Sequence, residues 1–311
     1  MGTLEVTVKL PAARGRVDVR ELLAFGAIYF LWGATFLAIR IAVLEIPPFF
    51  TAGLRFFVAG SFLYLVLRLS GEPAPSAVQW RGIAVIASAM FVVTYGALFW
   101  AAQFVPSSVV AVLEATLPII AMVLEVFVFR RQPFRWPMLW AVALGFGGIV
   151  LLLSKSGGGQ SFGVVPCLVI LCASVAWTLG AVLTRSMPLP RSVPLTAGAE
   201  MMLGGAVLLA ISLLTGELHP FPHISLHAGL AVVYLIVGGS LVAFTSYVWL
   251  LARMPATRVA SHAYVNPIVA VALGHFVLGE DVTPRMLFAS VLVVASVFLI
   301  LKPASVTEPT N

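Results

Sequence analysis

The sequence is poor in charged residues and in cysteine. Of its 311 residues, 18 are Lys or Arg and 12 are Asp or Glu, so 10% are charged, whereas 61% are hydrophobic. A soluble domain carries about 25% charged residues and must cover its surface with polar groups. The composition therefore excludes a soluble enzyme, a nucleic-acid-binding module and a secreted disulfide scaffold. It leaves a polytopic helical membrane protein.

Motifs for metal, phosphate and catalytic chemistry are also missing. Cys167 and Cys172 lie in one apolar run without histidines nearby, and the histidines between residues 219 and 227 have no Cys or acidic partners. The glycines at 157–159 are not followed by Lys-Ser/Thr. HExxH, GxSxG and paired Asp are absent from the spans. We predict no metal, no cofactor, no nucleic-acid partner and no enzymatic activity, with an intramembrane enzyme as a disfavoured alternative.

Long apolar runs fill most of the chain. A transmembrane helix needs about 20 mostly apolar residues, and prolines at or near the ends of such runs mark their boundaries. We therefore expect an all-α membrane protein with ten spans. They lie at residues 21–44, 48–69, 81–104, 106–130, 136–154, 163–185, 194–215, 226–252, 255–278 and 285–302.

The basic residues predict the orientation of these spans, because Lys and Arg concentrate in cytoplasmic loops. With ten spans and a cytoplasmic N-terminus, 14 of the 18 basic residues fall on the cytoplasmic side. They are Lys9, Arg14, Arg16, Arg20, Arg68, Arg81, Arg130, Arg131, Arg135, Arg185, Arg191, Arg253, Arg258 and Lys302. Only Lys155 and Arg285 fall outside, and Arg40 and Arg55 lie within spans.

The two halves of the chain repeat each other. At offset 145, the matches are Leu23 and Leu168, Trp32 and Trp177, Arg40 and Arg185, Thr51–Gly53 and Thr196–Gly198, and Gly60 and Gly205. At offset 149, they include Trp100 and Trp249, Pro106 and Pro255, and Pro118-Ile119 and Pro267-Ile268. Five spans per copy is an odd number, so the second copy enters the membrane from the opposite side. Inverted repeats of this kind are typical of secondary transporters, with the substrate near the midplane.

This duplication defines four segments. Residues 21–154 form the first five-helix repeat and residues 163–302 form the second, inverted repeat. Residues 1–20 and 303–311 are expected to be cytoplasmic tails.

Five short motifs carry a family resemblance. They are Trp32–Phe36 (WGATF), Pro47-Pro48, Arg55-Phe56, Tyr264–Pro267 (YVNP) and Gly279-Glu280. On these motifs the chain resembles the EamA branch of the drug/metabolite transporter superfamily and, within it, the YedA-like inner-membrane transporters. The resemblance implies ten helices, a central cavity lined by helices 1, 3, 4, 6, 8 and 9, and export of small metabolites across a bacterial plasma membrane.

One position departs from the family pattern. Each repeat in the family tends to carry a Glu about 13 residues after the proline of helix 4 or 9. Glu280 fits this pattern, but Arg131 stands at the related position of the first repeat. Position 131 is predicted to be cytoplasmic and position 280 external, so the positive-inside bias favours Arg at 131.

Glu114 is the sharpest candidate for a functional site. It lies eight residues into helix 4, about 12 Å deep at 1.5 Å per residue. An ionisable group at this depth is costly, and desolvation favours its protonated form. We interpret Glu114 as a substrate-binding residue and the candidate for proton coupling, with a purely structural carboxyl as the alternative.

A polar stripe and an aromatic set complete the predicted binding site. His262 and Asn266 follow Arg258 at spacings of four on helix 9. Trp32, Tyr95 and Trp177 suit an amphiphilic or cationic solute, and Tyr264 of the YVNP motif joins the set. The matching pair Arg55 and Glu200 is interpreted as structural anchoring.

The sequence thus predicts a secondary transporter that exports amino acids, amines or related amphiphilic solutes by alternating access. Its expected partners are a small-molecule substrate and the lipid bilayer. The sequence does not decide between a monomer and a homodimer. The alternative is an organo-phosphate or nucleotide-sugar antiporter, which is disfavoured because such substrates need several deep Arg or Lys residues.

Overall fold

The structure is a computed structural model. It describes residues 18–130, 134, 136–153, 163–184, 186–220, 223–251, 253, 259 and 261–301. Most of the two predicted tails, the loop near Gly157–Gly159, and Arg131, Arg185 and Arg258 lie outside the described residues.

Helices account for nearly all the described residues. Their bounds are α1 Val19–Gly26, η1 Ala27–Leu31, α2 Trp32–Val43, α3 Pro48–Leu69, α4 Ala77–Ala87, η2 Ser88–Val93, α5 Thr94–Ala101, α6 Ser107–Glu114, α7 Leu117–Val123, η3 Leu124–Val128, α8 Trp136–Leu153, α9 Val164–Leu183, α10 Val193–Leu214, α11 Leu226–Tyr234, η4 Leu235–Val242, α12 Ala243–Leu251, α14 His262–Leu278 and α15 Pro284–Leu301. The η elements are π-helical segments that continue into the neighbouring α-helices.

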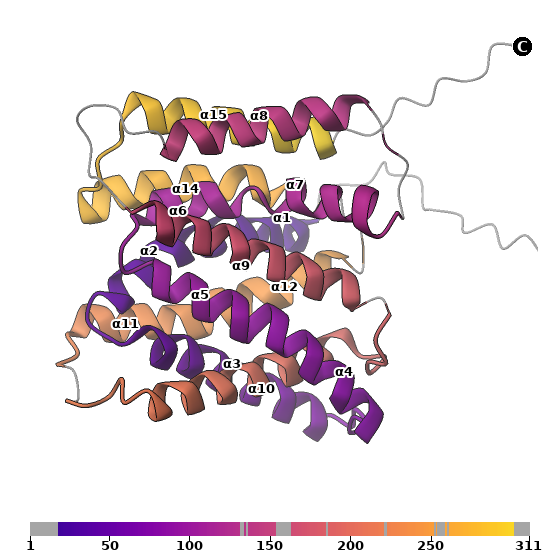
Figure 1. The fold of residues 1–311 in the computed structure, drawn as a ribbon. Coiled ribbons are helices and arrows are strands. Elements are labelled where there is room, and N and C mark those ends of the chain that lie inside the picture. The colour runs from indigo at the N-terminus through magenta and orange to yellow at the C-terminus, as the bar shows by residue number, and fades with distance from the viewer. Residues whose placement is uncertain are drawn as a thin grey trace, which may run out of the picture.

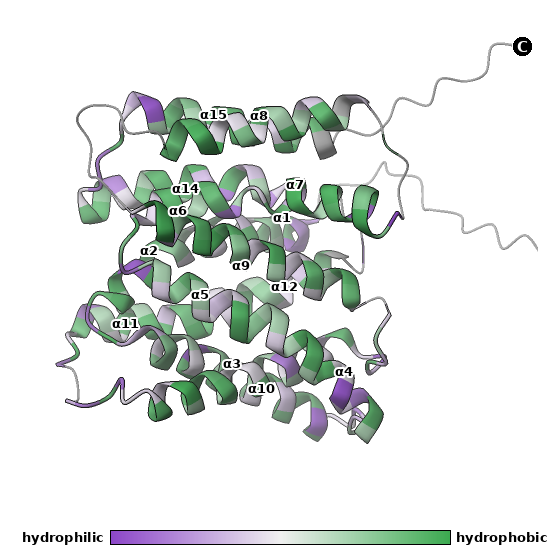
Figure 2. Cartoon of the chain, viewed as in Figure 1, coloured by the Kyte–Doolittle hydropathy of each residue, from purple (hydrophilic) through white to green (hydrophobic). Residues whose placement is uncertain are grey.

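These helices have the length and composition of membrane spans. Seven are long and apolar enough to cross a bilayer, and three shorter apolar helices cover Met138–Leu153, His262–Leu278 and Pro284–Leu299. Hydrophobic residues occupy most of the length of the helices, and hydrophilic residues lie mainly toward the helix ends (Figure 2). Large apolar side chains such as Phe276 and Leu214 are more than four-fifths exposed, as expected for a surface that faces lipid. The chain is a multi-pass membrane protein.

Local capping sets helix boundaries that the apolar runs do not reveal. Ser76 and Gln79 form a capping box, in which each side chain accepts a hydrogen bond from the backbone N–H of the other. The helix therefore begins at Ala77, four residues before the predicted span. Gln79 and Arg81 interrupt the apolar sequence near the start of this helix, so the long apolar run begins later than the helix.

A proline interrupts the fourth span immediately after Glu114. Helix α6 ends at Glu114 and α7 begins at Leu117, with Pro118 in its first turn. Because proline has no N–H, Pro118 cannot donate the helical hydrogen bond to the Glu114 carbonyl. Its sequence-related residue Pro267 lies inside the continuous helix α14. The first half thus has a helix break where the second half keeps a continuous helix.

Related π-helical segments occur in both halves of the chain. Segment η2 covers Ser88–Val93 and η4 covers Leu235–Val242. At the offset of 149, residues 88–93 correspond to 237–242, which lie inside η4. Segments of this type are frequent at functional sites because they displace backbone carbonyl groups from regular pairing.

Helices α3 and α10 cross with their backbones in contact. A Cβ atom added at Gly60 would lie 2.3 Å from the Met202 backbone nitrogen, and one at Gly205 would lie 2.3 Å from the Phe57 backbone nitrogen. Residue numbers rise along α3 as they fall along α10 at these contacts, so the two helices are antiparallel. Gly60 and Gly205 are also related by the offset of 145. Sequence-related glycines thus bring two related helices together in opposite directions.

Helices α8 and α15 form a pair at one side of the molecule. They pack extensively against each other and more sparsely against the remaining helices, and they lie side by side at the top of Figure 1. Gly148 makes this contact close, because an added Cβ would lie 3.0 Å from the Ala289 carbonyl oxygen. The helices that carry the candidate site lie below this pair in Figure 1.

The glycine contact gives a stability prediction. Gly60→Ala should destabilise the protein by roughly 1–3 kcal/mol, because the new methyl group meets rigid backbone atoms. Gly147→Ala is the matched control, since nothing lies within 4 Å of its added Cβ. That change should stabilise the helix by up to about 1 kcal/mol. Thermal unfolding in detergent measures both, and equal melting temperatures for the two variants would contradict the crossing.

Candidate functional site

Glu114 lies at the end of α6, directly before the helix break. Its side chain is half-buried, and the Ser174 hydroxyl lies 2.9 Å from Glu114 Oε1 and 3.0 Å from the Ile170 carbonyl oxygen. The single hydroxyl hydrogen serves one of these acceptors at a time. The Ser174 hydroxyl on α9 therefore divides its hydrogen bond between Glu114 and the Ile170 carbonyl oxygen. Glu114 itself lies at the break between α6 and α7.

Aromatic side chains of α5 and α9 lie near this carboxyl group. Trp177 lies one helical turn beyond Ser174 on α9, so the two share a face. The Trp177 ring packs edge-on against Tyr95 at 5.8 Å and against Phe91 at 6.3 Å. Tyr95 also interacts electrostatically with Glu114. The predicted residues Tyr95, Trp177 and Glu114 are thus brought together.

Arg55 adds a buried cation to the same cluster. Its side chain is 3% exposed, its Nε donates to Ser240 Oγ at 2.9 Å, and its Nη1 has no hydrogen-bond partner among the described residues. The guanidinium carbon lies 4.7 Å from the centre of the Phe56 ring and 5.6 Å from that of Tyr95. Arg55 and Glu114 therefore both interact with Tyr95. We call Arg55, Tyr95, Glu114, Ser174 and Trp177 the central cluster.

A second aromatic group gathers around Trp32. The Trp32 ring lies 5.1 Å from Tyr247 and 5.1 Å from His262, measured between ring centres. Tyr247 and His262 contact each other at 5.9 Å. The structure therefore brings predicted residues Trp32 and His262 together, whereas Arg258 of the predicted stripe lies outside the described residues.

Segment η4 connects these two groups. The Trp32 indole N–H donates to the Gly239 carbonyl at 3.0 Å, and the next residue, Ser240, accepts from Arg55. A Cβ added at Gly239 would lie 3.0 Å from Arg55 Nη2 and 2.7 Å from the Thr35 methyl group. Glycine is therefore needed where η4 passes between helices α2 and α3.

Asn266 has a structural position. With its amide oriented to satisfy the surrounding carbonyl groups, its nitrogen donates to Ile28 and Tyr29 at 3.1 Å and to His262 at 3.2 Å. Ile28 and Tyr29 belong to η1. The Asn266 amide thus links α14 to a π-helical segment of the first span.

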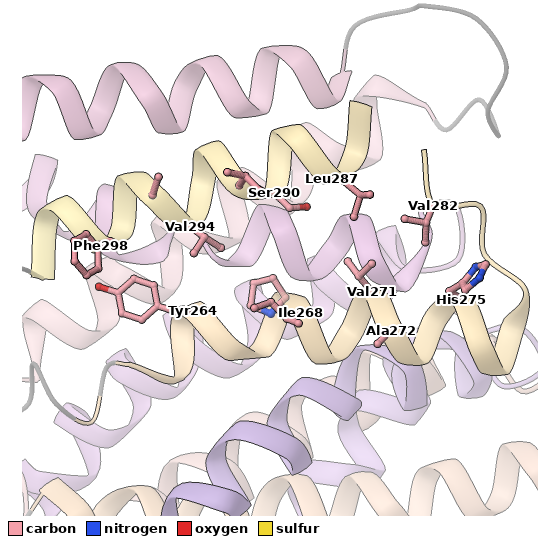
Figure 3. Close-up of a pocket in the computed structure, with 13 residues that line it drawn as sticks. Tyr264, Ile268, Val271, Ala272, His275, Val282, Leu287, Ser290, Val294 and Phe298 are labelled. Carbon is pink, nitrogen blue, oxygen red and sulfur yellow. The ribbon is translucent and has the colours of Figure 1, made fainter. Parts of the chain in front are cut away.

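Tyr264 lies apart from the central cluster. Its hydroxyl donates to the Val297 carbonyl at 3.1 Å, and its ring lies 6.3 Å from Phe298. Both rings lie at one end of an apolar groove of about 1070 Å³ between α14 and α15, with His275 at the other end (Figure 3). The described lining residues include none of the central cluster. Ile268 and Val291 are more than 60% exposed, so the groove opens on the outer surface.

Some site residues gave little or no signal in the sequence. Ser174 and Ser240 are ordinary small residues of apolar spans, and Tyr247 has no motif. Arg55 was recognisable as an intramembrane charge within a motif, but its partners lie on η4 and α5, far away in sequence. These contacts depend on how the spans pack against one another, and that packing cannot be predicted from a single sequence.

Both halves of the chain match one known protein family. The sequence model of the EamA-like transporter family matches residues 20–154 and again residues 165–302. The chain belongs to the EamA-like transporter family. Each match covers one of the two predicted repeats.

Individual relatives extend the comparison. The chain is 35% identical over 280 residues to the "Uncharacterized inner membrane transporter YedA" of Escherichia coli (strain K12), covering 89% of each chain. It is 25% identical to a "Probable amino-acid metabolite efflux pump" of Salmonella typhimurium, covering 86% of this chain and 90% of the relative. A solved crystal structure aligns with a TM-score of 0.60 at 21% identity, covering 91% of this chain and 96% of that chain. This last likeness concerns the fold alone.

The Arg55–Ser240 contact gives a second prediction. Ser240→Ala removes the hydrogen bond at Nε of a buried guanidinium, so it should destabilise the protein by about 1.5–3 kcal/mol. Ser88→Ala is the matched control, because Ser88 is exposed and bonds only within its own helix. Thermal unfolding of both variants in detergent tests this expectation, which fails if the two melting temperatures fall equally.

Proposed function

We propose that this protein is a secondary transporter that exports small metabolites across the plasma membrane by alternating access. Its substrates are amino acids, amines or related amphiphilic solutes. The observation that carries the proposal is the Glu114 carboxyl group, which lies beside a helix break, is bonded to Ser174 and interacts electrostatically with Tyr95, whose ring packs against Trp177. Broken helices and intramembrane carboxyl groups are where transporters hold substrates and protons.

We infer that ten spans form two inverted repeats around this site. The double family match supports the duplication, and the antiparallel crossing of α3 and α10 through related glycines supports the inversion. The distribution of Lys and Arg supports cytoplasmic termini. In this orientation, Glu114 lies about 11 Å from the external start of α6, at 1.5 Å per residue.

Substrate contact and proton coupling both follow from the chemistry of the central cluster. The aromatic faces of Tyr95 and Trp177 attract a cationic or apolar group, and an ionised Glu114 attracts an ammonium group. A protonated Glu114 cannot do so. Binding of a proton and of a cationic group at Glu114 therefore compete, which is the basis of antiport in this proposal.

The alternative substrate class is an organic anion, such as an organo-phosphate or a nucleotide sugar. Arg55 Nη1, which has no hydrogen-bond partner in the described part of the chain, favours an anionic group. This Arg is the one buried Arg or Lys below 9% exposure among the described residues, and multiply charged phosphates usually require several cations. A carboxylate carries one charge and suits this site better.

Ligand binding gives the third prediction. Purified protein in detergent is heated with amino acids, amines, nucleosides, sugars or sugar phosphates, and the same panel is run on Glu114→Gln. Amino acids or amines should stabilise the wild type by about 2.7 kcal/mol at a hundredfold excess over Kd. Glu114→Gln should lose this stabilisation, because the neutral amide cannot balance an ammonium group.

The control variant is Glu21→Gln, which changes a carboxyl group in the first turn of α1. It should respond to ligands as the wild type does. Stabilisation by sugar phosphates alone would favour the antiporter alternative. Equal stabilisation of the wild type and Glu114→Gln by amines would remove Glu114 from the binding site.

A further inference from the structure

Three glutamates lie at one end of the helix bundle and bond to helix N-termini there. Glu45 accepts from the backbone N–H and the hydroxyl of Ser225, both at 2.8 Å, at the start of α11. Glu217 follows α10 and accepts from the first turn of α3, from Phe49 N–H at 3.4 Å and Phe50 N–H at 3.1 Å. We call this end, at the left of Figure 1, the glutamate end.

Glu280 makes the third and most buried of these contacts. Its carboxylate accepts from the Ser107 and Ser108 backbone N–H groups at 2.7 and 3.1 Å, and from the Ser108 hydroxyl at 2.6 Å. The residue is 6% exposed. A Cβ at Gly274 would lie 2.5 Å from Glu280 Oε2, so glycine there makes room for the carboxylate. Arg40 of α2 also interacts electrostatically with Glu280.

Each of these contacts joins one half of the chain to the other. Glu45 lies in the first half and caps a helix of the second, whereas Glu217 and Glu280 lie in the second half and cap helices of the first. The first N–H groups of a helix have no partner within it, and the partial positive charge there favours a carboxylate. In keeping with this, the hydrogen bonds from Ser225 hold the pKa of Glu45 below its usual value.

In the part of the chain that the structure describes, the opposite end of the bundle has no such set of glutamate caps between the halves. The positions related to Glu45, Glu217 and Glu280 are occupied by Pro190, Glu72 and Arg131, of which Arg131 lies outside the described residues. Among the described residues, the Glu72 carboxylate caps no helix, and only its backbone carbonyl accepts a bond, from Arg68.

The related helix starts α4 and α11 show how the two ends differ. Ser76 and Ser225 are the N-caps of these helices and are related by the offset of 149. The Ser76 N–H donates to Gln79 of its own helix at 2.8 Å, whereas the Ser225 N–H donates to Glu45 of the other half. Ala228 stands where Gln79 stands in the first half. The N–H group of the N-cap serine thus bonds within its own helix at the α4 end and to the other half of the chain at the glutamate end.

We propose that Glu45, Glu217 and Glu280 form an extracellular latch that holds the two repeats together on the outer side and must release before the transporter opens outward. This inference rests on the proposed function for the meaning of opening and on the positive-inside orientation for the outer side. The latch stabilises the conformation described here, with its glutamate end closed. When the latch releases, the three carboxylates and the N–H groups that they cap exchange these hydrogen bonds for hydrogen bonds to water. Water can reach them because the glutamate end faces the outer side of the membrane.

Glutamine substitutions test the latch with little change in shape. The Glu217 and Glu280 carboxylates each accept from backbone N–H groups on both oxygens, so a Gln NH₂ group would face a donor in either orientation. At Glu45 one partner is the Ser225 hydroxyl, which can also accept, so Gln there mainly removes the charge. The test variant is Glu45→Gln/Glu217→Gln/Glu280→Gln, in a background with Cys167→Ala and Cys172→Ala. Glu72→Gln is the matched control, because it removes the same charge at the position related to Glu217.

Spin-label distances report the opening at each end. One pair replaces Phe104 and Leu230, which are exposed at the glutamate end. The other replaces Arg81 and Arg253, the positions related to Leu230 and Phe104 by the offset of 149, which are exposed at the opposite end. In reconstituted protein, the triple variant should raise the ratio of long to short Phe104–Leu230 distances at least about tenfold, the factor that one charge-assisted hydrogen bond supports. The Arg81–Arg253 pair should not lengthen.

Unchanged Phe104–Leu230 distances in the triple variant, or the same change in Glu72→Gln, would overturn the latch. Lengthening at both ends together would also overturn it, because that indicates loosening of the whole bundle. If the triple variant does not fold, the double variant Glu45→Gln/Glu217→Gln, which retains the buried Glu280, carries the test. The proposed function is judged separately by the ligand panel: opening without ligand binding would support the latch and contradict the transport site, and binding without opening would do the reverse.

Discussion

The contact between α3 and α10 is the constraint on which the arrangement depends. Gly60 and Gly205 allow the two backbones to touch, and each glycine occupies the related position in its half of the chain. Such small-residue contacts let helices associate in lipid, where burial of apolar surface supplies no drive. They bring related helices together in opposite directions, which fixes how the remaining helices of each half can surround them.

The central cluster follows from this crossing. Arg55 lies on α3, and its side chain reaches Ser240 of η4 and Tyr95 of α5. Tyr95 interacts electrostatically with both Arg55 and Glu114. Glu114 owes its place to Pro118, which ends α6 at that residue. The crossing supplies a fixed point, and the helix break after Glu114 supplies a position that can change. Contacts between the halves at the glutamate end would then decide which side of the site is open.

Sequence patterns revealed the parts of this arrangement that depend on local physics. Apolar runs and prolines located the helices, the matches at Trp32 and Gly60 revealed the duplication, and the cost of a membrane carboxyl singled out Glu114. Three features of the structure could not be predicted from the sequence. The Arg55–Ser240 bond depends on the face that each span presents, and the π-helical segments have no residue signature. Glu280 was recognised only as fitting the family pattern, and its bonds to Ser107 and Ser108 were not foreseen. Tyr264 carried a motif but lies on the outer groove, where its role in substrate binding stays a prediction.

The central claim is that Glu114 exchanges a proton for substrate. The most direct measurement is uptake of a stabilising amine or amino acid into proteoliposomes under an imposed pH gradient, with counterflow measured in parallel. The wild type should accumulate the solute against its gradient. Glu114→Gln should lose this accumulation, even where weak counterflow persists. Accumulation by Glu114→Gln at the wild-type rate and with the same dependence on pH would contradict the claim.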